Sequence, residues 1–202
     1  MAKRLASGRH QLTRDEVAAH QKQRLFKALG AVMGVKGYSS TTVDDLIKNA
    51  GVSRATFYQH FESKQDCFMA GYARMQGHII DAIGRAPTTG TPMQRFSTML
   101  DQYLGFMSMD PPTARLYLVE VYSAGPEAMT RRFELQQEFV AGVAKLFNAR
   151  SQADRFACKA LVAAISSLVI GALTDGRPED FLALKKPVLT FAERAMGPAA
   201  QP

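Results

Sequence analysis

Polar side chains that donate hydrogen bonds are concentrated between residues 53 and 64 of this 202-residue chain. They belong to arginine, threonine, tyrosine, glutamine, histidine and lysine, which suit the phosphate oxygens and base edges of duplex DNA. Phe57 and Phe61 lie among them, four residues apart, which is the spacing of one buried helix face. The segment therefore predicts a short helix that buries its phenylalanines and presents its donors to a nucleic acid.

A second short helix is predicted immediately before it, so that the pair forms a helix-turn-helix at about residues 42–61. Thr42 and Asp45 have the spacing of a capping box, which starts this helix. Gly51 follows its last apolar position, where a left-handed backbone favours glycine, and Ser53 caps the next helix. Two helices held at a fixed angle by such a turn present the second one to a DNA major groove.

This stretch resembles the N-terminal helix-turn-helix of the TetR family of transcriptional repressors. The residues that carry the resemblance are Thr42, Gly51-Val52-Ser53, Phe57-Tyr58, His60-Phe61 and Lys64. Because isolated helix-turn-helix patterns are common by chance, the combination of these residues is more specific than the pattern alone.

The resemblance implies which residues touch DNA. Contacts to base edges are expected from Arg54, Ala55 and Thr56. Contacts to the DNA backbone are expected from Thr42, Ser53, Tyr58, His60 and Lys64. Gln59 is also a candidate, although it departs from the aromatic residue that many members of the family have there.

The positive charge of the chain is unevenly distributed. The formal net charge is +7, and residues 1–64 hold eleven lysines and arginines against five aspartates and glutamates. A basic excess that coincides with the helix-turn-helix indicates a polyanion-binding unit, whereas a solubilising tail would not explain the coincidence. Lys3, Arg4 and Arg9 form either an arm that touches DNA or a solvated tail.

Helical periodicity predicts an all-α fold of about nine helices, and no segment alternates like a strand. One helix is expected over residues 13–36, and a long one begins at Ser63. The expected division is a DNA-binding domain of residues 1–64, containing three helices, and a larger ligand-binding and dimerisation domain of residues 65–202. Pro187 is expected to kink or divide the last helix.

The larger domain is rich in methionine, since seven of the ten methionines lie between Met69 and Met129. Methionine adapts to varied apolar ligands, although at helical spacing it is more often an ordinary core residue. The family resemblance implies a pocket for a small apolar inducer in this domain. Its candidate lining residues are Met99, Tyr103, Met107, Leu118, Tyr122, Phe133, Gln137 and Val140.

Residues 151–174 form a segment that is apolar nearly all round, with a stripe of small residues. It is either the core of a monomer or a dimer interface. The resemblance favours a homodimer, because TetR proteins pair their last two helices across a two-fold axis. The expected interface residues are Ala160, Ala164, Leu168, Gly171, Phe181 and Val188. A dimer presents two recognition helices, so its double-stranded DNA operator should be palindromic.

Other function classes lack their motifs. The four histidines have no metal-ligand spacing and no nucleotide-binding glycine pattern occurs, so no metal, cofactor or catalytic residue is expected. Two distant cysteines suit a reducing cytosol, and the longest uncharged run is shorter than the roughly 20 residues of a membrane span. The sequence therefore predicts a cytoplasmic, ligand-responsive repressor without membrane contact. The alternatives are an all-α enzyme and a ligand-independent architectural DNA-binding protein.

Overall fold

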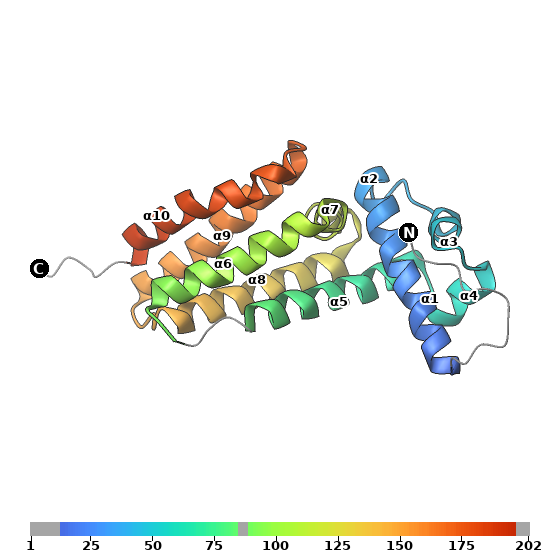
Figure 1. Cartoon of the computed structure of the whole chain (residues 1–202), viewed down its shortest axis with the longest axis horizontal. Helices are drawn as coiled ribbons and strands as arrows, with labels where there is room; N and C mark the ends of the chain where they lie inside the picture. Colours follow the sequence, from blue (N-terminus) through green and yellow to red (C-terminus); the bar gives the residue numbers. More distant parts are fainter. Residues whose placement is uncertain (1–12, 85–88, 197–202) are drawn as a thin grey trace, which may run out of the picture.

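The computed structural model describes residues 13–84 and 89–196, and within these ranges every regular element is helical (Figure 1). The all-α prediction is confirmed. The elements are α1 (Arg14–Ala28), the π-helical segment η1 (Leu29–Met33), α2 (Gly34–Lys36), α3 (Val43–Ala50), α4 (Arg54–His60), α5 (Lys64–Gly84), α6 (Pro92–Met109), α7 (Pro111–Leu118), the 3₁₀ segment η2 (Glu120–Ser123), α8 (Pro126–Leu146), α9 (Gln152–Thr174), the 3₁₀ segment η3 (Pro178–Leu184) and α10 (Lys185–Met196). The basic arm discussed above, at residues 1–12, lies outside the described residues.

Local sequence signals fix the helix-turn-helix formed by α3 and α4. The Thr42 hydroxyl accepts from the Asp45 backbone N–H at 3.2 Å, and Asp45 Oδ2 accepts from the Thr42 N–H at 2.8 Å. Gly51 ends α3 with a φ of 62°, in the left-handed region that favours glycine. Ser53 Oγ then accepts from the Thr56 N–H at 3.0 Å to start α4. All three predicted caps of this unit are confirmed.

The first helix is not continuous, contrary to the single helix expected over residues 13–36. It begins at the predicted Thr13 capping box, but η1 interrupts the α-helical turn before α2. Here the chain passes close to α7: a Cβ atom on Gly30 would clash with the Thr113 side chain, and one on Gly34 with the Pro112 backbone. A widened π turn, with Gly30 in it and Gly34 directly after it, therefore lies where the N-terminal helices meet the larger domain.

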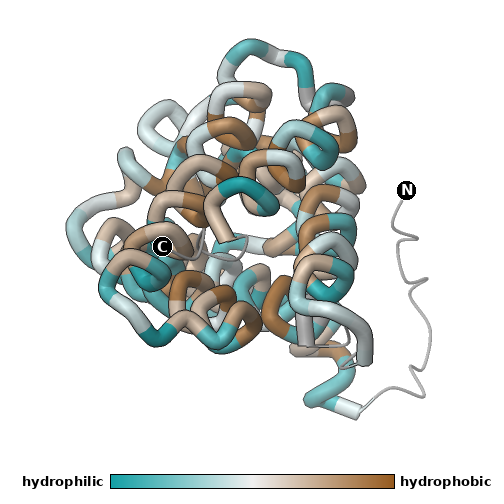
Figure 2. The backbone as a smooth tube through the Cα atoms, turned by 90° about the vertical axis from the view of Figure 1, so that its left-hand side faces the viewer, coloured by the Kyte–Doolittle hydropathy of each residue, from teal (hydrophilic) through white to brown (hydrophobic). Residues whose placement is uncertain are grey.

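The long helix α5 joins the two parts of the molecule. In Figure 1, α1 to α4 form a group on the right, and α5 leads out of it along α8 into a bundle with α6, α9 and α10. Figure 2 looks down the length of this bundle, and its helices alternate between hydrophilic and hydrophobic stretches, as helices with one buried side do. One hydrophobic core cluster extends from Leu25 in α1 to Ala192 in α10, so the two parts share a continuous interior.

The last helical segment is divided two residues before Pro187. The 3₁₀ segment η3 gives way to α10 at Lys185, and Pro187 lies in the first turn of α10. A proline in a first turn removes an N–H that has no helical partner, so it is tolerated without a kink. Pro187 also has no N–H to continue the preceding helical turn, so a division two residues before it agrees with the expected effect of this proline.

Helix α9 is the most apolar element of the described chain. It has 23 residues with a mean hydropathy of 2.1 over its most apolar window, which is long and apolar enough by composition to cross a membrane. The expectation that this segment is too short for a span considered only its uncharged part. Mostly buried core helices of soluble proteins have the same composition, whereas 28% of this window is buried here, including Cys158, Leu161 and Val169. Length and hydropathy alone are weak support for a span.

Candidate nucleic-acid interface and internal cavity

The recognition helix α4 is anchored by its two phenylalanines. Phe57 and Phe61 are buried and their ring centroids lie 5.8 Å apart, while a third ring, that of Phe26 in α1, lies 5.8 Å from Phe61. The predicted DNA-contacting residues lie on the remaining sides of this helix, next to its two ends and, for Thr42, at the start of α3. The exposed ones are Thr42, Ser53, Arg54, Ala55, Tyr58 and Gln59, and the partly exposed ones are Thr56, His60 and Lys64. Each candidate residue therefore keeps some surface that a ligand could reach.

Arg54 is already paired within the chain. Its Nη2 atom donates to Oδ1 of Asp44 at 2.6 Å, and both side chains are largely exposed. This hydrogen bond raises the pKa of the Arg54 guanidinium above its ordinary value, so the side chain stays charged. The pair joins the start of α4 to the start of α3, and a DNA base would have to compete with Asp44 for the guanidinium.

Two of the predicted backbone contacts also hold the unit together. Lys64 Nζ donates to the backbone carbonyls of Tyr38 at 2.8 Å and Thr41 at 2.9 Å, and lies 4.2 Å from the centre of the Tyr38 ring. His60 Nε2 is 2.8 Å from Gln21 Oε1 of α1. Burial lowers the pKa of both Lys64 and His60, although a lysine shifted from so high a value remains charged at neutral pH.

Two further basic residues stiffen the same surface and were not singled out from the sequence. Arg24 Nη2 donates to the Gly51 carbonyl at 2.5 Å, which ties α1 to the turn of the helix-turn-helix. Lys36 Nζ lies 2.8 Å from Asp45 Oδ2, and this ion pair, with the Thr42 hydrogen bonds, lowers the pKa of Asp45. Their signal in the sequence was only their charge, because their partners lie on other helices.

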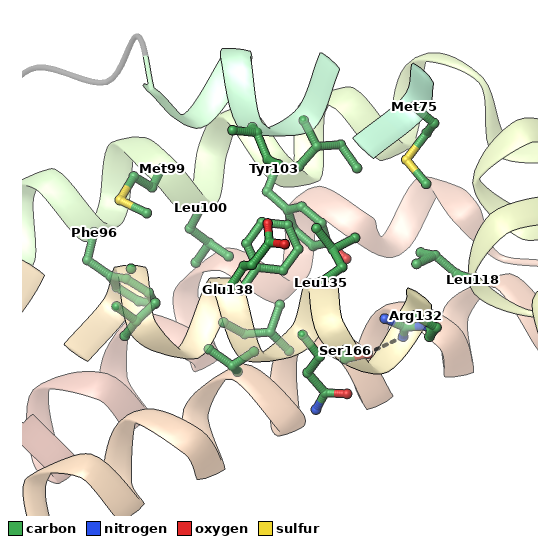
Figure 3. Close-up of a pocket in the computed structure, with 18 residues that line it drawn as sticks. Met75, Phe96, Met99, Leu100, Tyr103, Leu118, Arg132, Leu135, Glu138 and Ser166 are labelled. Carbon is green, nitrogen blue, oxygen red and sulfur yellow. Dashed lines mark hydrogen bonds between the residues drawn. The ribbon is translucent and has the colours of Figure 1, made fainter. Parts of the chain in front are cut away.

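A cavity of about 400 Å³ lies inside the larger domain, between α5, α6, α7, α8 and α9. Its volume is within the range of about 300–1,000 Å³ that is usual for small-molecule sites. The side chains that line it are mostly apolar: Met75, Ile79, Ile80, Phe96, Met99, Leu100, Tyr103, Leu118, Arg132, Leu135, Gln136, Glu138, Phe139, Gly142, Val143, Val162, Ile165 and Ser166. Figure 3 shows Phe96 and Met99 at one end of it and Leu118 and Arg132 at the other.

Few polar groups face this cavity, and the most buried of them is Arg132. Its side chain is 7% exposed, and its Nη2 donates to Ser166 Oγ of α9 at 2.7 Å (Figure 3). Burial raises the pKa of the Tyr103 hydroxyl to about 12, against the opposite influence of the Arg132 charge. Tyr103 is therefore a neutral hydrogen-bonding group at physiological pH.

Three of the predicted pocket residues, Met99, Tyr103 and Leu118, line this cavity. The other five do not: Met107, Tyr122, Phe133, Gln137 and Val140. Met107 is buried elsewhere in the core, while Tyr122, Phe133 and Gln137 are exposed.

The reason for the difference is the rotation of α8. The residues of α8 that face the interior are Arg132, Leu135, Phe139 and Val143, at intervals of three and four. This stripe is shifted by about one residue, or about 100° around the helix, from the one assumed from the sequence. An arginine within an otherwise apolar stripe was the signal that could have identified Arg132.

The predicted interface residues on α9 and α10 separate into two groups. Ala160, Ala164, Leu168 and Gly171 retain exposed surface on α9, and a Cβ atom on Gly171 would meet nothing within 4 Å. Phe181 and Val188 are instead core residues, at 0% and 4% exposure, because η3 and α10 turn them toward α6. The large apolar side chains that α9, η3 and α10 do expose are Phe156, Leu168, Leu182 and Phe191.

No group of three or more potential ligands that could hold a metal ion occurs in residues 13–84 and 89–196. Both cysteines are buried, and burial raises the pKa of the Cys67 thiol to about 12. A thiol in this state is a poor nucleophile, so Cys67 is a packing residue.

Comparison with known proteins places the helix-turn-helix in a family. The family model described as "Bacterial regulatory proteins, tetR family" matches residues 25–70, which include α3 and α4. The transcriptional activator FasR of Mycolicibacterium smegmatis is 28% identical over 119 residues, which cover 58% of this chain and 52% of FasR. The transcriptional repressor KstR of Rhodococcus jostii is 28% identical over 126 residues, which cover 60% of this chain and 53% of KstR. The chain thus matches about half the length of these curated relatives.

Solved structures match over nearly the whole chain. The fatty acid degradation regulator FadR of Bacillus halodurans has a TM-score of 0.77 at 18% identity and covers 90% of this chain and 97% of its own. FadR of Bacillus subtilis, solved in complex with stearoyl-CoA, has a TM-score of 0.74 at 16% identity, with 88% and 98% covered. At such low identity these matches establish the fold. The curated relatives FasR and KstR are transcriptional regulators, and neither is described as an enzyme.

Proposed function

The chain belongs to the TetR family of bacterial regulatory proteins, and on that premise we propose that it binds a palindromic DNA operator as a homodimer and leaves it when a small apolar molecule occupies its cavity. The observation that carries the proposal is the exposed donor surface of α4, held rigidly on a basic N-terminal unit. The base-edge contacts would come from Arg54, Ala55 and Thr56. The backbone contacts would come from Thr42, Ser53, Tyr58, His60 and Lys64, with Gln59 beside them.

The dimer part of the proposal rests on α9 and α10. Four large apolar side chains lie exposed on α9, η3 and α10, while the small residues of α9 leave room for a second helix. Pairing two copies through α9 and α10 would bury this surface and give the molecule two recognition helices. We therefore assign the interface to Ala160, Ala164, Leu168 and Gly171 together with Phe156 and Phe191.

Two connections link the cavity to the DNA-binding unit. Helix α5 starts at Lys64, directly after the recognition helix, and lines the cavity with Met75, Ile79 and Ile80. Helix α7 lines it with Leu118 and packs against η1. Either helix would carry a displacement of the cavity wall into the N-terminal unit.

A hydrogen bond at the end of α7 reinforces the second connection. Glu120 Oε2 accepts from the Tyr38 backbone N–H at 2.9 Å, and Glu120 Oε1 lies 3.5 Å from Arg115 Nη2. Tyr38 in turn supplies a carbonyl to Lys64. The segment between α2 and α3 is thus held from the larger domain on one side and from the start of α5 on the other.

The mechanism we propose is a shift between two populations. A ligand that fits the cavity better when the two recognition helices are wrongly spaced lowers operator affinity by its preference for that state. Allosteric coupling is typically about 1–3 kcal/mol, which changes affinity by about 5- to 150-fold. The same arrangement permits activation as well as repression, and the relatives FasR and KstR include one of each.

We also propose domain boundaries and a location for the protein. We assign residues 1–64 to DNA binding and residues 65–202 to ligand binding and dimerisation, with a cytoplasmic location and no membrane contact. An architectural DNA-binding protein without a ligand would have no use for an apolar cavity of about 400 Å³, so the cavity favours a sensor.

The experiment that tests the proposal is selection of bound sequences from random duplex DNA with the full-length protein. An enriched palindrome, with half-sites about one helical turn or a multiple of it apart, is the expected result. Enrichment of a single unrepeated half-site would contradict the dimer, and no enrichment at all would contradict sequence-specific binding.

A further inference from the structure

Arg132 is a buried cation beside an apolar cavity, with no acidic partner among the residues that the structure describes. The residue is 7% exposed, and of its side-chain nitrogens only Nη2 has a hydrogen bond within the described residues, to the neutral hydroxyl of Ser166. Its Nε atom is buried without any hydrogen-bond partner. Arginine stays charged in proteins, and a buried charge is normally paired.

Glu138 is the acidic residue of the cavity wall, but it is not the counter-ion of Arg132. Glu138 also lines the cavity and belongs to the same helix, but it follows Arg132 by six residues, which is about 9 Å along the helix axis. It is exposed, and no ion pair joins it to Arg132 in the described part of the chain. In Figure 3 its carboxylate lies toward the middle of the cavity, away from the guanidinium. The positive end of the cavity therefore remains without a counter-ion.

The surroundings of Arg132 define what a ligand would meet. The opposite end of the cavity is formed by Phe96, Met99 and Leu100, and Val143 extends the apolar wall along α8. A molecule with a long apolar body can lie against these side chains, where it displaces water from apolar surface. A single acid group at its end would reach the guanidinium and the Ser166 hydroxyl.

We propose that the ligand of this cavity is an apolar monocarboxylate, whose carboxylate pairs with Arg132 and Ser166 while its hydrocarbon body lies toward Phe96 and Met99. This inference rests on the proposed function and names the ligand class of its sensor site. A carboxylate matches the planar fork of N–H donors on a guanidinium, and the pairing would satisfy the orphaned Nε. A neutral alcohol of equal length can supply the apolar body but not the charge.

An acyl thioester is the alternative ligand class that this proposal must be distinguished from. Its carbonyl is neutral, and the charges of a coenzyme A group lie on phosphates far from the acyl carbonyl. Such a ligand would leave Arg132 without a counter-ion if its acyl chain filled the cavity. The charge of Arg132 therefore distinguishes a free acid from its thioester.

The test measures binding to the full-length protein by titration calorimetry in the absence of DNA, with decanoate, 1-decanol and decanoyl-coenzyme A as probes. The expected result is that decanoate binds about tenfold or more tightly than decanol, as one charge-assisted pair provides. Equal affinity for acid and alcohol would overturn the proposal. Tighter binding of the thioester than of the acid would also overturn it.

Three variants locate the effect. Arg132→Gln should abolish the preference for decanoate over decanol, so that the affinities for decanoate and decanol become similar. Lys145→Gln removes the same charge from an exposed position of the same helix and should change neither. Leu100→Trp should block both probes, because Leu100 is buried at 3% exposure and lines the cavity, so a larger ring there takes up cavity volume. A decanoate preference that survives Arg132→Gln, or undiminished binding by a folded Leu100→Trp variant, overturns the site.

The DNA experiment separates this inference from the proposed function. If decanoate binds through Arg132 but does not release the selected palindrome, the ligand class holds and ligand control of DNA binding fails. If the palindrome is selected but none of the three probes binds, the ligand class fails and DNA recognition holds.

Discussion

The guanidinium of Arg54, the first residue of the recognition helix, lies 2.6 Å from a carboxylate oxygen of Asp44, the second residue of the helix before it. The pair is exposed to solvent and bridges the open side of the helix-turn-helix. An exposed ion pair contributes little to stability, so its principal effect is to fix where the guanidinium lies before DNA arrives.

Arg54→Ala should weaken binding to the selected operator by about 5- to 150-fold and relax the base preference at one position of each half-site. The reason is that a bidentate contact to guanine is lost together with its discrimination. Repeating the sequence selection with the variant measures both effects. An unchanged set of selected sequences and an unchanged affinity would show that Arg54 does not contact bases.

Asp44→Asn should have the opposite effect on binding. It removes a negative charge from the DNA-facing surface and frees Arg54 from its partner, so affinity should rise for operator and for unrelated duplexes alike. Fluorescence anisotropy at several salt concentrations provides the comparison. Weaker operator binding by this variant would show instead that Asp44 holds Arg54 in its reading position.

Lys64→Met should lower both DNA affinity and stability. Two of the three N–H donors of the ammonium are used by the Tyr38 and Thr41 carbonyls, which leaves one for a phosphate. We expect a loss of about 1–2 kcal/mol in the free energy of unfolding. The salt slope of DNA binding should fall by about one per half-site.

The matched control for Lys64 is Lys48→Met, at an exposed position of α3. It should leave the unfolding free energy unchanged. A Lys64 variant that loses stability but keeps the salt slope of the wild type would make Lys64 a structural residue alone.

Glu120→Ala should reduce the effect of ligand on DNA binding. It removes the acceptor of the Tyr38 N–H and the ion-pair partner of Arg115, and should cost about 1–3 kcal/mol of stability. Anisotropy titrations with and without ligand would give the coupling as the ratio of the two operator affinities. Glu134→Ala, which breaks an exposed pair with Arg131 on α8, should leave that ratio unchanged. If ligand changes the operator affinity of the Glu120 variant as much as that of the wild type, the effect of the ligand reaches the DNA-binding unit through α5.

Gly171→Leu should convert the protein from dimer to monomer without unfolding it. A side chain at this position meets nothing within 4 Å in the chain itself, so only a second molecule would be obstructed. Sedimentation velocity measures the oligomeric state, and circular dichroism checks the fold. Gly77→Leu, at an equally open site on α5, should remain dimeric. A dimeric Gly171 variant would place the interface elsewhere.

The part of the molecule that the sequence predicted best is the part determined by neighbouring residues. The caps at Thr42 and Ser53 and the left-handed Gly51 depend on residues within one turn, and each was found as expected. The buried face of α4 followed from the spacing of Phe57 and Phe61 in the same way.

Features that depend on how a helix is rotated against distant ones were harder to predict. The apolar residues of α8 could be assigned to two overlapping stripes, and the one that was chosen placed Phe133 inside although it is 63% exposed. Phe181 is a large apolar residue, which suits an interface and a core equally, and only its packing against α6 decides between the two. The two carbonyl partners of Lys64 could not be predicted either, because they lie 23 and 26 residues earlier in the chain.

The π-helical segment η1 makes the length of the first helix a functional variable. A π turn arises from one residue more than an α-helix of the same span would need. Deleting one residue there, such as the exposed Ala31, would restore a regular α-helix of the same span and remove the widened turn that brings Gly30 against Thr113 of α7. A single codon lost at this point would therefore change how the first helix meets the larger domain without altering any residue that is predicted to touch DNA.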